Sequence, residues 1–280
     1  MIAPTLIELV AYAFVFLVGA CIGSFLNVCI ARWPAQLSVV APRSRCPSCG
    51  HAIAWYENIP LLSWLVLRGR CRGCRGAISP IYPAVELLVA IGWLAAVVAF
   101  GFGFTALRIA VFGTVLLGVS ITDAKHYVIP DGFTVFGFVW VIVTAFVGQL
   151  IGEILPFAGA GDAILGACVG AGAIAIAGWL GEVAFKKEAM GFGDATLMAV
   201  VGGALGPWRA LLTVFVAAFL GAALFLLVVY PISWLRARRT QQEFAPPMVP
   251  FGVFLAPAAL VTLLWGSALI AWYAEQLPLP

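Results

Sequence analysis

Two aspartates stand at the ends of apolar runs, where a carboxylate has few neighbours that can stabilise its charge. Asp123 closes the run that ends in Ser-Ile-Thr-Asp, and Asp194 opens another run directly after a Gly-Phe-Gly sequence. Ionisable residues in such places are candidates for function. If the two carboxylates face each other, they can share a water and one proton, which is the arrangement that hydrolyses peptide bonds in aspartic proteases.

The two glycines before Asp194 bear on how a substrate could reach it. Gly191 and Gly193 lack a Cβ, so we expect them to permit close approach of another chain and to allow φ > 0. The alternative for Asp194 is that it only caps the N-terminus of a helix.

Four cysteines form two close pairs that suit a metal ion. Cys46 and Cys49 frame one C-x-x-C knuckle and Cys71 and Cys74 frame a second, with 21 residues between the knuckles. This spacing predicts a closed, tetrahedral zinc site with a structural role, and neighbouring arginines would offset the thiolate charge. The remaining cysteines lie in apolar runs and are expected to be small packing residues: Cys21, Cys29 and Cys168.

The composition defines the elements that must position these side chains. The 280 residues are 64% hydrophobic and only 10% charged, far from the ~25% charged residues of soluble domains. A span needs ~20 apolar residues, and the first apolar run is longer than the core of a secretory signal. We therefore predict an all-α polytopic membrane protein of about eight transmembrane helices, with spans near 7–30, 83–101, 106–123, 132–151, 161–185, 195–206, 209–233 and 252–273.

The segment 31–82 interrupts this pattern, because it is rich in arginine and proline and holds both knuckles. We predict three parts: a first transmembrane helix at 1–30, a small zinc-ribbon-like domain at 31–82, and a membrane core at 83–280. The sixth span is short, and Pro207 marks a turn after it. The main alternative is that the sixth and seventh spans are one helix.

Orientation follows from the positive residues, which favour the cytoplasmic side. With eight spans, every Lys and Arg except Arg108 and Arg209 falls on the side of the 31–82 segment. That segment is then cytoplasmic, and both Asp123 and Asp194 lie at the cytoplasmic membrane edge.

Other polar residues compete for a role in the site. Asp162 follows a similar glycine-acid spacing but falls on the outer side, and Asp131 after Pro130 is typical of a turn or helix cap. Asn27 and Glu86 lie in the first two spans near their cytoplasmic ends. They could line a substrate or methyl-donor cleft, or they could hydrogen-bond between helices.

An ordered set of motifs supports one family. The chain resembles the bacterial type IV prepilin peptidases, also called prepilin leader peptidase/N-methyltransferases, over nearly its whole length. Besides the knuckles, the resemblance is carried by Gly23–Val28, Arg32–Pro34, Trp55–Pro60, Ile78–Leu87, Thr122-Asp123, Ile129–Asp131, Gly191–Asp194 and Pro250–Gly252.

The resemblance implies a site and an activity. Asp123 and Asp194 match the catalytic aspartates of the family, and the four cysteines match its zinc ligands. It implies removal of the short basic leader from type IV prepilins and type II secretion pseudopilins, and methylation of the new N-terminus with S-adenosylmethionine. It also implies a multi-pass protein of the bacterial inner membrane whose active site faces the cytoplasm and whose partners include lipid but no nucleic acid.

Three alternatives remain open from the residues alone. The chain could be a peptidase without methyltransferase activity, because no glycine-rich donor site of the Rossmann kind is visible. It could be a non-enzymatic zinc-ribbon scaffold for pilus or secretion assembly. It could be a transporter, although transporter acids lie near the bilayer midplane.

Overall fold

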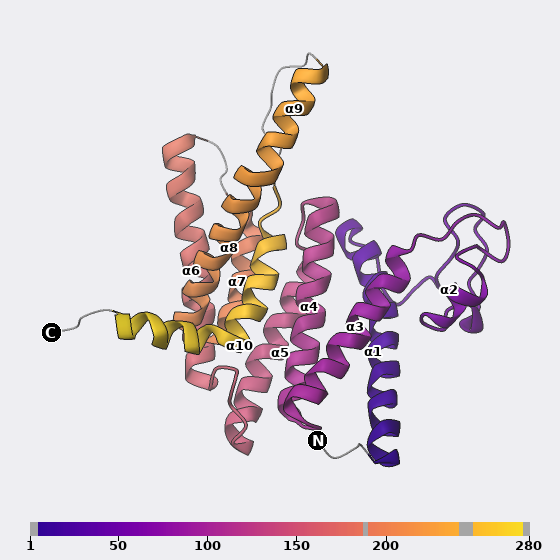
Figure 1. The fold of residues 1–280 in the computed structure, drawn as a ribbon, viewed down its shortest axis with the longest axis horizontal. Helices are drawn as coiled ribbons and strands as arrows, with labels where there is room; N and C mark the ends of the chain where they lie inside the picture. Colours follow the sequence, from indigo (N-terminus) through magenta and orange to yellow (C-terminus); the bar gives the residue numbers. More distant parts are fainter. Residues whose placement is uncertain (1–4, 187–189, 241–248, 277–280) are drawn as a thin grey trace. The chain divides into compact units, whose positions relative to one another are not determined.

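The computed structural model describes residues 5–186, 190–240 and 249–276 and divides the chain into two compact units. The first unit covers Met1–Gly118 and the second Val119–Pro280. Helices supply the regular structure of both units (Figure 1), which confirms the predicted all-α class. The functional division at residues 30 and 82 stays a prediction.

Within the described residues, seven helices are long and apolar enough to cross a membrane. All seven lie close to predicted spans: α1 (Leu6–Arg32), α3 (Ile81–Phe100), α4 (Phe104–His126), α5 (Asp131–Ile151), α6 (Ala160–Phe185), α8 (Pro207–Leu224) and α10 (Gly252–Gln276). The remaining predicted span is α7 (Phe192–Leu205), a shorter apolar helix. The chain is therefore a multi-pass membrane protein in which one predicted crossing falls short.

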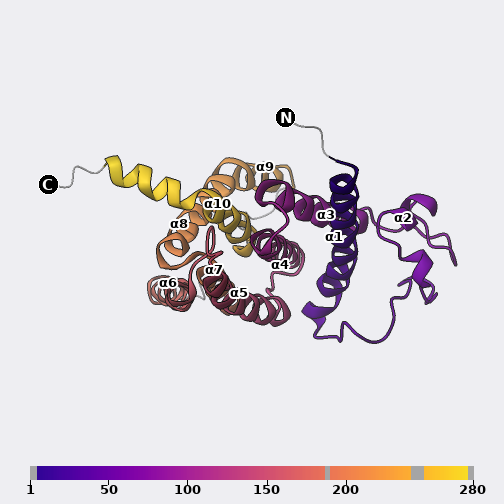
Figure 2. The same ribbon diagram turned by 90° about the horizontal axis from the view of Figure 1, so that it is seen from below.

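In the first unit, α1 and α3 lie side by side (Figures 1 and 2) because glycine lets their backbones touch. A Cβ on Gly19 would lie 2.9 Å from Cα of Ala90, and a Cβ on Gly23 would lie 2.7 Å from Cα of Glu86. Small residues four apart are the usual means of close helix packing in lipid. The chain between the two helices holds only the short helix α2 (Leu62–Val66), single helical turns and isolated β-bridges.

In the second unit, α7 is the central helix. It packs against α5, α6, α8 and α10 (Figure 2), and its last turns are almost fully buried. Its 14 residues would extend about 21 Å, less than the ~30 Å of a bilayer core. Protein therefore encloses α7 from Leu197 onward.

The alternative of one fused sixth and seventh helix is wrong. Gly206 between α7 and α8 has φ 80 and ψ 173, a conformation open to glycine but not to other residues. Pro207 then starts α8, where its missing N–H is not needed. Beyond α8, the chain continues as a short π-helix (Phe225–Val229) and then as α9 (Tyr230–Thr240). The helical segment therefore extends beyond residue 233, where the seventh span was predicted to end.

The backbones of α6 and α7 are in direct contact. A Cβ placed on Gly202 of α7 would collide with the backbone carbonyl of Gly166, and one on Gly170 of α6 would collide with the carbonyl of Met198. Because backbone cannot yield as a flexible side chain can, these positions require glycine.

We expect Gly202→Ala to destabilise the second unit by at least the ~1–3 kcal/mol typical of overpacking. Gly172→Ala in α6 is the matched control, because a Cβ there meets nothing within 4 Å and alanine is the better helix former by ~1 kcal/mol. Thermal unfolding in detergent measures the difference. Equal midpoints for the two variants would contradict the close α6–α7 contact.

Candidate active site and cysteine cluster

Asp123 lies in the last turn of α4 and is 5% exposed. The helix ends soon afterwards, because Tyr127 takes up a left-handed conformation with φ 55 while its N–H donates to the backbone carbonyl of Asp123. The Oδ2 of Asp123 accepts a hydrogen bond from the N–H of Val253 at 3.2 Å. Val253 is in the first turn of α10, so the aspartate faces the N-terminal end of that helix.

Gly252 makes this approach possible. A Cβ at Gly252 would lie 2.7 Å from Oδ2 of Asp123, a distance that would push the carboxylate away. The N-terminal end of a helix favours a negative charge through its unpaired N–H groups and its dipole. The start of α10 therefore provides Asp123 with a fixed, favourable partner for its charge.

Asp194 comes from a different helix and meets the same place. It is the third residue of α7 and half-buried, and the N-cap of that helix is Gly191, so the simple N-cap interpretation of Asp194 is wrong. Gly193, directly before Asp194, and Gly252, which lies against Asp123, both approach the side chain of Ile129. Ile129 links the two sides, because Cβ atoms on Gly193 and on Gly252 would each lie 3.0 Å from it.

The structure thus brings Asp123 and Asp194 together within one unit, as the predicted topology requires. Their catalytic role stays a prediction. The expectation of φ > 0 at the two glycines is wrong. Gly191 has φ −77, and Gly193 is not among the positive-φ residues of the described chain. What these glycines provide is room for close approach.

The rival acids lie elsewhere. Asp162 is exposed in the first turn of α6, and its backbone lies beside Gly206 at the far end of α7 from Asp194. Asp131 is exposed as the first residue of α5, where Pro130 is the N-cap. Neither aspartate is itself an N-cap, although each lies in a first helical turn, where an acid is favourable.

The four cysteines of the knuckles come together in the first unit. Their sulfur atoms all lie within 4.8 Å of one another, with 3.9 Å between Cys46 and Cys74 and 4.0 Å between Cys49 and Cys71. A tetrahedral site with metal–sulfur distances of ~2.3 Å needs sulfur separations of about 3.8 Å. The donor set and its spacing therefore fit one metal ion.

The remaining cysteines lie outside this cluster. Cys29 is buried, as expected of a packing residue, but Cys21 and Cys168 are exposed on their helix surfaces.

The two knuckles are structural repeats, which our reading of the sequence missed. In the first, Cys46 N–H donates to the carbonyl of His51, and in the second Cys71 N–H donates to that of Gly76, at 2.9 and 2.8 Å. Each also has a β-bridge at the same offset, Arg45 with Ala52 and Arg70 with Ala77. A signal was present, because Arg-Cys-x-x-Cys-x-x-Ala-Ile occurs at 45–53 and again at 70–78.

Glu57 contacts both knuckles. Its carboxylate lies 3.0 Å from His51 Nε2 in the first knuckle and 3.4 Å from an Arg72 nitrogen in the second, and its side chain is only 6% exposed. The hydrogen bond from Ala54 N–H, followed by the bond with His51, holds the pKa of Glu57 below its usual value. His51 therefore pairs with the Glu57 carboxylate and is not part of the four-cysteine cluster.

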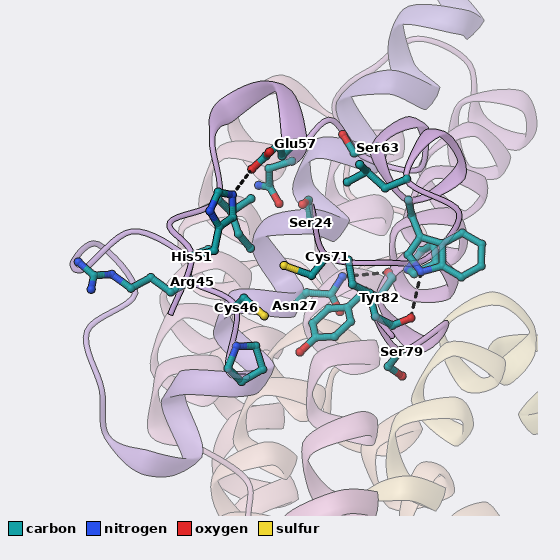
Figure 3. Close-up of a pocket in the computed structure, with 18 of the residues that line it drawn as sticks. Ser24, Asn27, Arg45, Cys46, His51, Glu57, Ser63, Cys71, Ser79 and Tyr82 are labelled. Atoms are coloured by element: carbon teal, nitrogen blue, oxygen red, sulfur yellow. Dashed lines mark hydrogen bonds and ion pairs between the residues drawn. The ribbon is translucent and has the colours of Figure 1, made fainter. Parts of the chain in front are cut away.

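A cavity of about 490 Å³ opens between the knuckles and the ends of α1 and α3 (Figure 3). Asn27 and Glu86 both line it, as the sequence suggested for a cleft. Asn27 Nδ2 donates to the carbonyl of Tyr82 at 3.0 Å. Glu86 Oε2 accepts from the N–H of Leu61 at 2.7 Å, so its partner lies in the connecting segment rather than on another long helix.

These features define a class: a multi-pass membrane protein with a carboxylate pair and a separate four-cysteine cluster. Two family models match the chain, the bacterial peptidase A24 N-terminal domain over residues 17–100 and the type IV leader peptidase family over 110–226. The first contains all four cysteines, and the second contains both aspartates. No solved structure matches the chain.

Relatives match over most of their length. A prepilin leader peptidase/N-methyltransferase of Myxococcus xanthus is 41% identical across 87% of this chain and 72% of that protein. Proteins of the same name in Aeromonas hydrophila and Pseudomonas aeruginosa are both 36% identical, covering 94% and 92% of this chain and 93% and 92% of the relatives. The chain belongs to the type IV leader peptidase family.

Purified protein is expected to carry about one metal ion per chain, because four thiolates fill a tetrahedral shell. Cys71→Ser should lower the metal content and the stability of the first unit. Cys168→Ser is the control, because this exposed cysteine lies outside the cluster. Elemental mass spectrometry of protein prepared without chelator measures the content, and an absence of metal would contradict the site.

Proposed function

We propose that this chain is a membrane aspartic endopeptidase that removes the leader from prepilins and methylates the new N-terminus. The observation that carries the proposal is that Asp123 and Asp194, from two different helices, gather around Ile129 beside the N-terminus of α10. The names of the relatives support both activities.

The surroundings of the two carboxylates suggest different roles. The Val253 N–H and the N-terminal end of α10 stabilise a negative charge on Asp123. Two close carboxylates cannot both ionise cheaply, so one proton resides on the pair. We assign Asp123 as the general base that takes a proton from the attacking water, and Asp194 as the general acid that donates its proton as the peptide bond breaks.

The reaction fits the edge of a bilayer. The substrate class is a chain with a short basic leader followed by an apolar helix, as in prepilins and secretion pseudopilins. The concentration of Lys and Arg on one side of the predicted topology supports a cytoplasmic location for the pair. The enzyme then resides in the lipid bilayer of the inner membrane and cuts where the leader leaves it.

We assign zinc to Cys46, Cys49, Cys71 and Cys74, because four thiolates at tetrahedral spacing are the donor set of structural zinc. Bound zinc would stabilise the fold of the two knuckles. A shell of four cysteines leaves no open position for a substrate, so we route no catalytic step through the metal.

Methylation needs a second substrate, S-adenosylmethionine. The lone pair of the new N-terminal amine attacks the methyl carbon, the carbon–sulfur bond breaks with its electrons going to sulfur, and the amine releases a proton to water. The carboxylate pair is not needed for this step. We place the methyl donor in the first unit, near Asn27 and Glu86.

Asp123→Asn and Asp194→Asn should each reduce leader cleavage by at least ~10³-fold, because each removes one half of the acid–base pair. Asp162→Asn is the matched control, since this acid also follows two glycines but lies at the other end of α7. Intact-mass measurement of a prepilin incubated with each variant gives the result. Full cleavage by either the Asp123 or the Asp194 variant would contradict the assignment of these two aspartates as the catalytic pair.

Methylation should survive loss of cleavage. Asp194→Asn protein should still methylate a pre-cleaved pilin supplied with S-adenosylmethionine, because the methyl donor binds at a separate site. The pilin should gain about 14 mass units per methyl group, the mass of CH₂. A charged donor analogue such as sinefungin should block this addition without blocking cleavage by the unaltered enzyme. If the unaltered enzyme yields only unmethylated product, the peptidase-only alternative holds.

A further inference from the structure

The cavity beside the knuckles is built from polar groups on two helices. Ser24 and Asn27 project from one face of α1, being three residues apart, and Tyr82 and Glu86 come from the first turns of α3. The connecting segment adds further lining residues, and Figure 3 shows Asn27 hydrogen-bonded to the backbone of Tyr82. A volume of about 490 Å³ is within the range of small-molecule sites.

Glu86 is a buried carboxylate that lines this cavity and, unlike Glu57, is in none of the ion pairs of the described chain. It is 9% exposed, and within the described part of the chain its one hydrogen bond comes from the N–H of Leu61 at 2.7 Å to Oε2. A buried carboxylate with a single neutral donor remains poorly compensated, so a cationic ligand would complete the site.

The donor to Glu86 sits in a strained turn. Leu61 has φ 62 and ψ −51, and the N–H of Leu62 bonds back to the carbonyl of Pro60 at 2.6 Å, which makes a γ-turn of the rare, positive-φ kind. A leucine held in this region costs of order 1–3 kcal/mol and is found where the surroundings enforce it, often at functional sites. The turn directs its N–H at Glu86.

Gly23 determines where Glu86 stands. A Cβ on Gly23 would lie 2.7 Å from Cα of Glu86 and 3.2 Å from its carbonyl oxygen. The close contact therefore presses the backbone of Glu86 against α1 beside Ser24 and Asn27. One oxygen of the carboxylate accepts from Leu61, and within the described part of the chain the other oxygen accepts no hydrogen bond.

Resting on the proposed methyl transfer, we propose that Glu86 faces the sulfonium centre of the methyl donor in this cavity. A sulfonium carries a positive charge but no N–H or O–H, so a protein recognises it through a carboxylate and through the faces of aromatic rings. Tyr82 and Trp64 line the same cavity. Methyl transfer converts the sulfonium to a neutral thioether, so the attraction to Glu86 ends with the reaction and the spent product can be exchanged for fresh donor.

Glu86→Gln separates charge from shape, because the glutamine oxygen can still accept the Leu61 N–H. The dissociation constants of S-adenosylmethionine and of S-adenosylhomocysteine are measured by calorimetry with the full chain in detergent. We expect the variant to bind the sulfonium ligand about tenfold more weakly, the effect of ~1.4 kcal/mol, and to bind the thioether nearly as before. Glu182→Gln, an exposed carboxylate on α6, is the matched control and should change neither constant.

Glu86→Asp keeps the charge and should preserve more of the preference for the sulfonium ligand than Glu86→Gln does. Thermal midpoint and metal content establish that each variant is folded. Equal weakening of both ligands, or no weakening of either, would overturn the assignment while leaving methyl transfer intact. An unaltered enzyme that binds neither ligand and never methylates would overturn the proposed methyl transfer as well.

Discussion

A carboxylate enclosed by protein needs a hydrogen-bond donor, and in this chain backbone N–H groups supply it. Val253 donates to Asp123 in the second unit, and Leu61 donates to Glu86 in the first. Glu57 also accepts from a backbone N–H, in addition to its pairs with His51 and Arg72. A neutral, rigid donor stabilises the charge without cancelling it, so the carboxylate stays available for a proton, a water or a cationic ligand.

Glycine provides the geometry for these donors. Gly252 lets α10 begin against Asp123, and Gly23 lets the backbone of Glu86 rest against α1. The contact of Gly166 with Gly202 joins α6 to α7, the helix that carries Asp194. In lipid there is little hydrophobic gain from bringing helices together, so close backbone packing must hold the sites in place.

Much of this arrangement could be predicted from the sequence. Apolar length located the spans, and the asymmetry of Lys and Arg placed Asp123 and Asp194 on one side, where the structure brings them together. The two C-x-x-C knuckles predicted the cysteine cluster. What local pattern could not predict was tertiary: the donor Val253 lies 130 residues from Asp123 in the chain. The break at Gly206 was visible as a short span followed by Pro207, whereas the γ-turn at Leu61 left no sign in residue type.

The central claim is that Asp123 and Asp194 face each other across a short gap. The test uses a chain in which Cys21, Cys29 and Cys168 are changed to serine. In this chain, Asp123 and Asp194 are each replaced by cysteine, and a mild oxidant is added to the membranes. Peptide mass mapping then identifies the disulfides. The account predicts a 123–194 disulfide and none between 123 and 162 in a chain with cysteines at those two positions. A cross-link only in the second chain, or equal cross-linking in both, would contradict it.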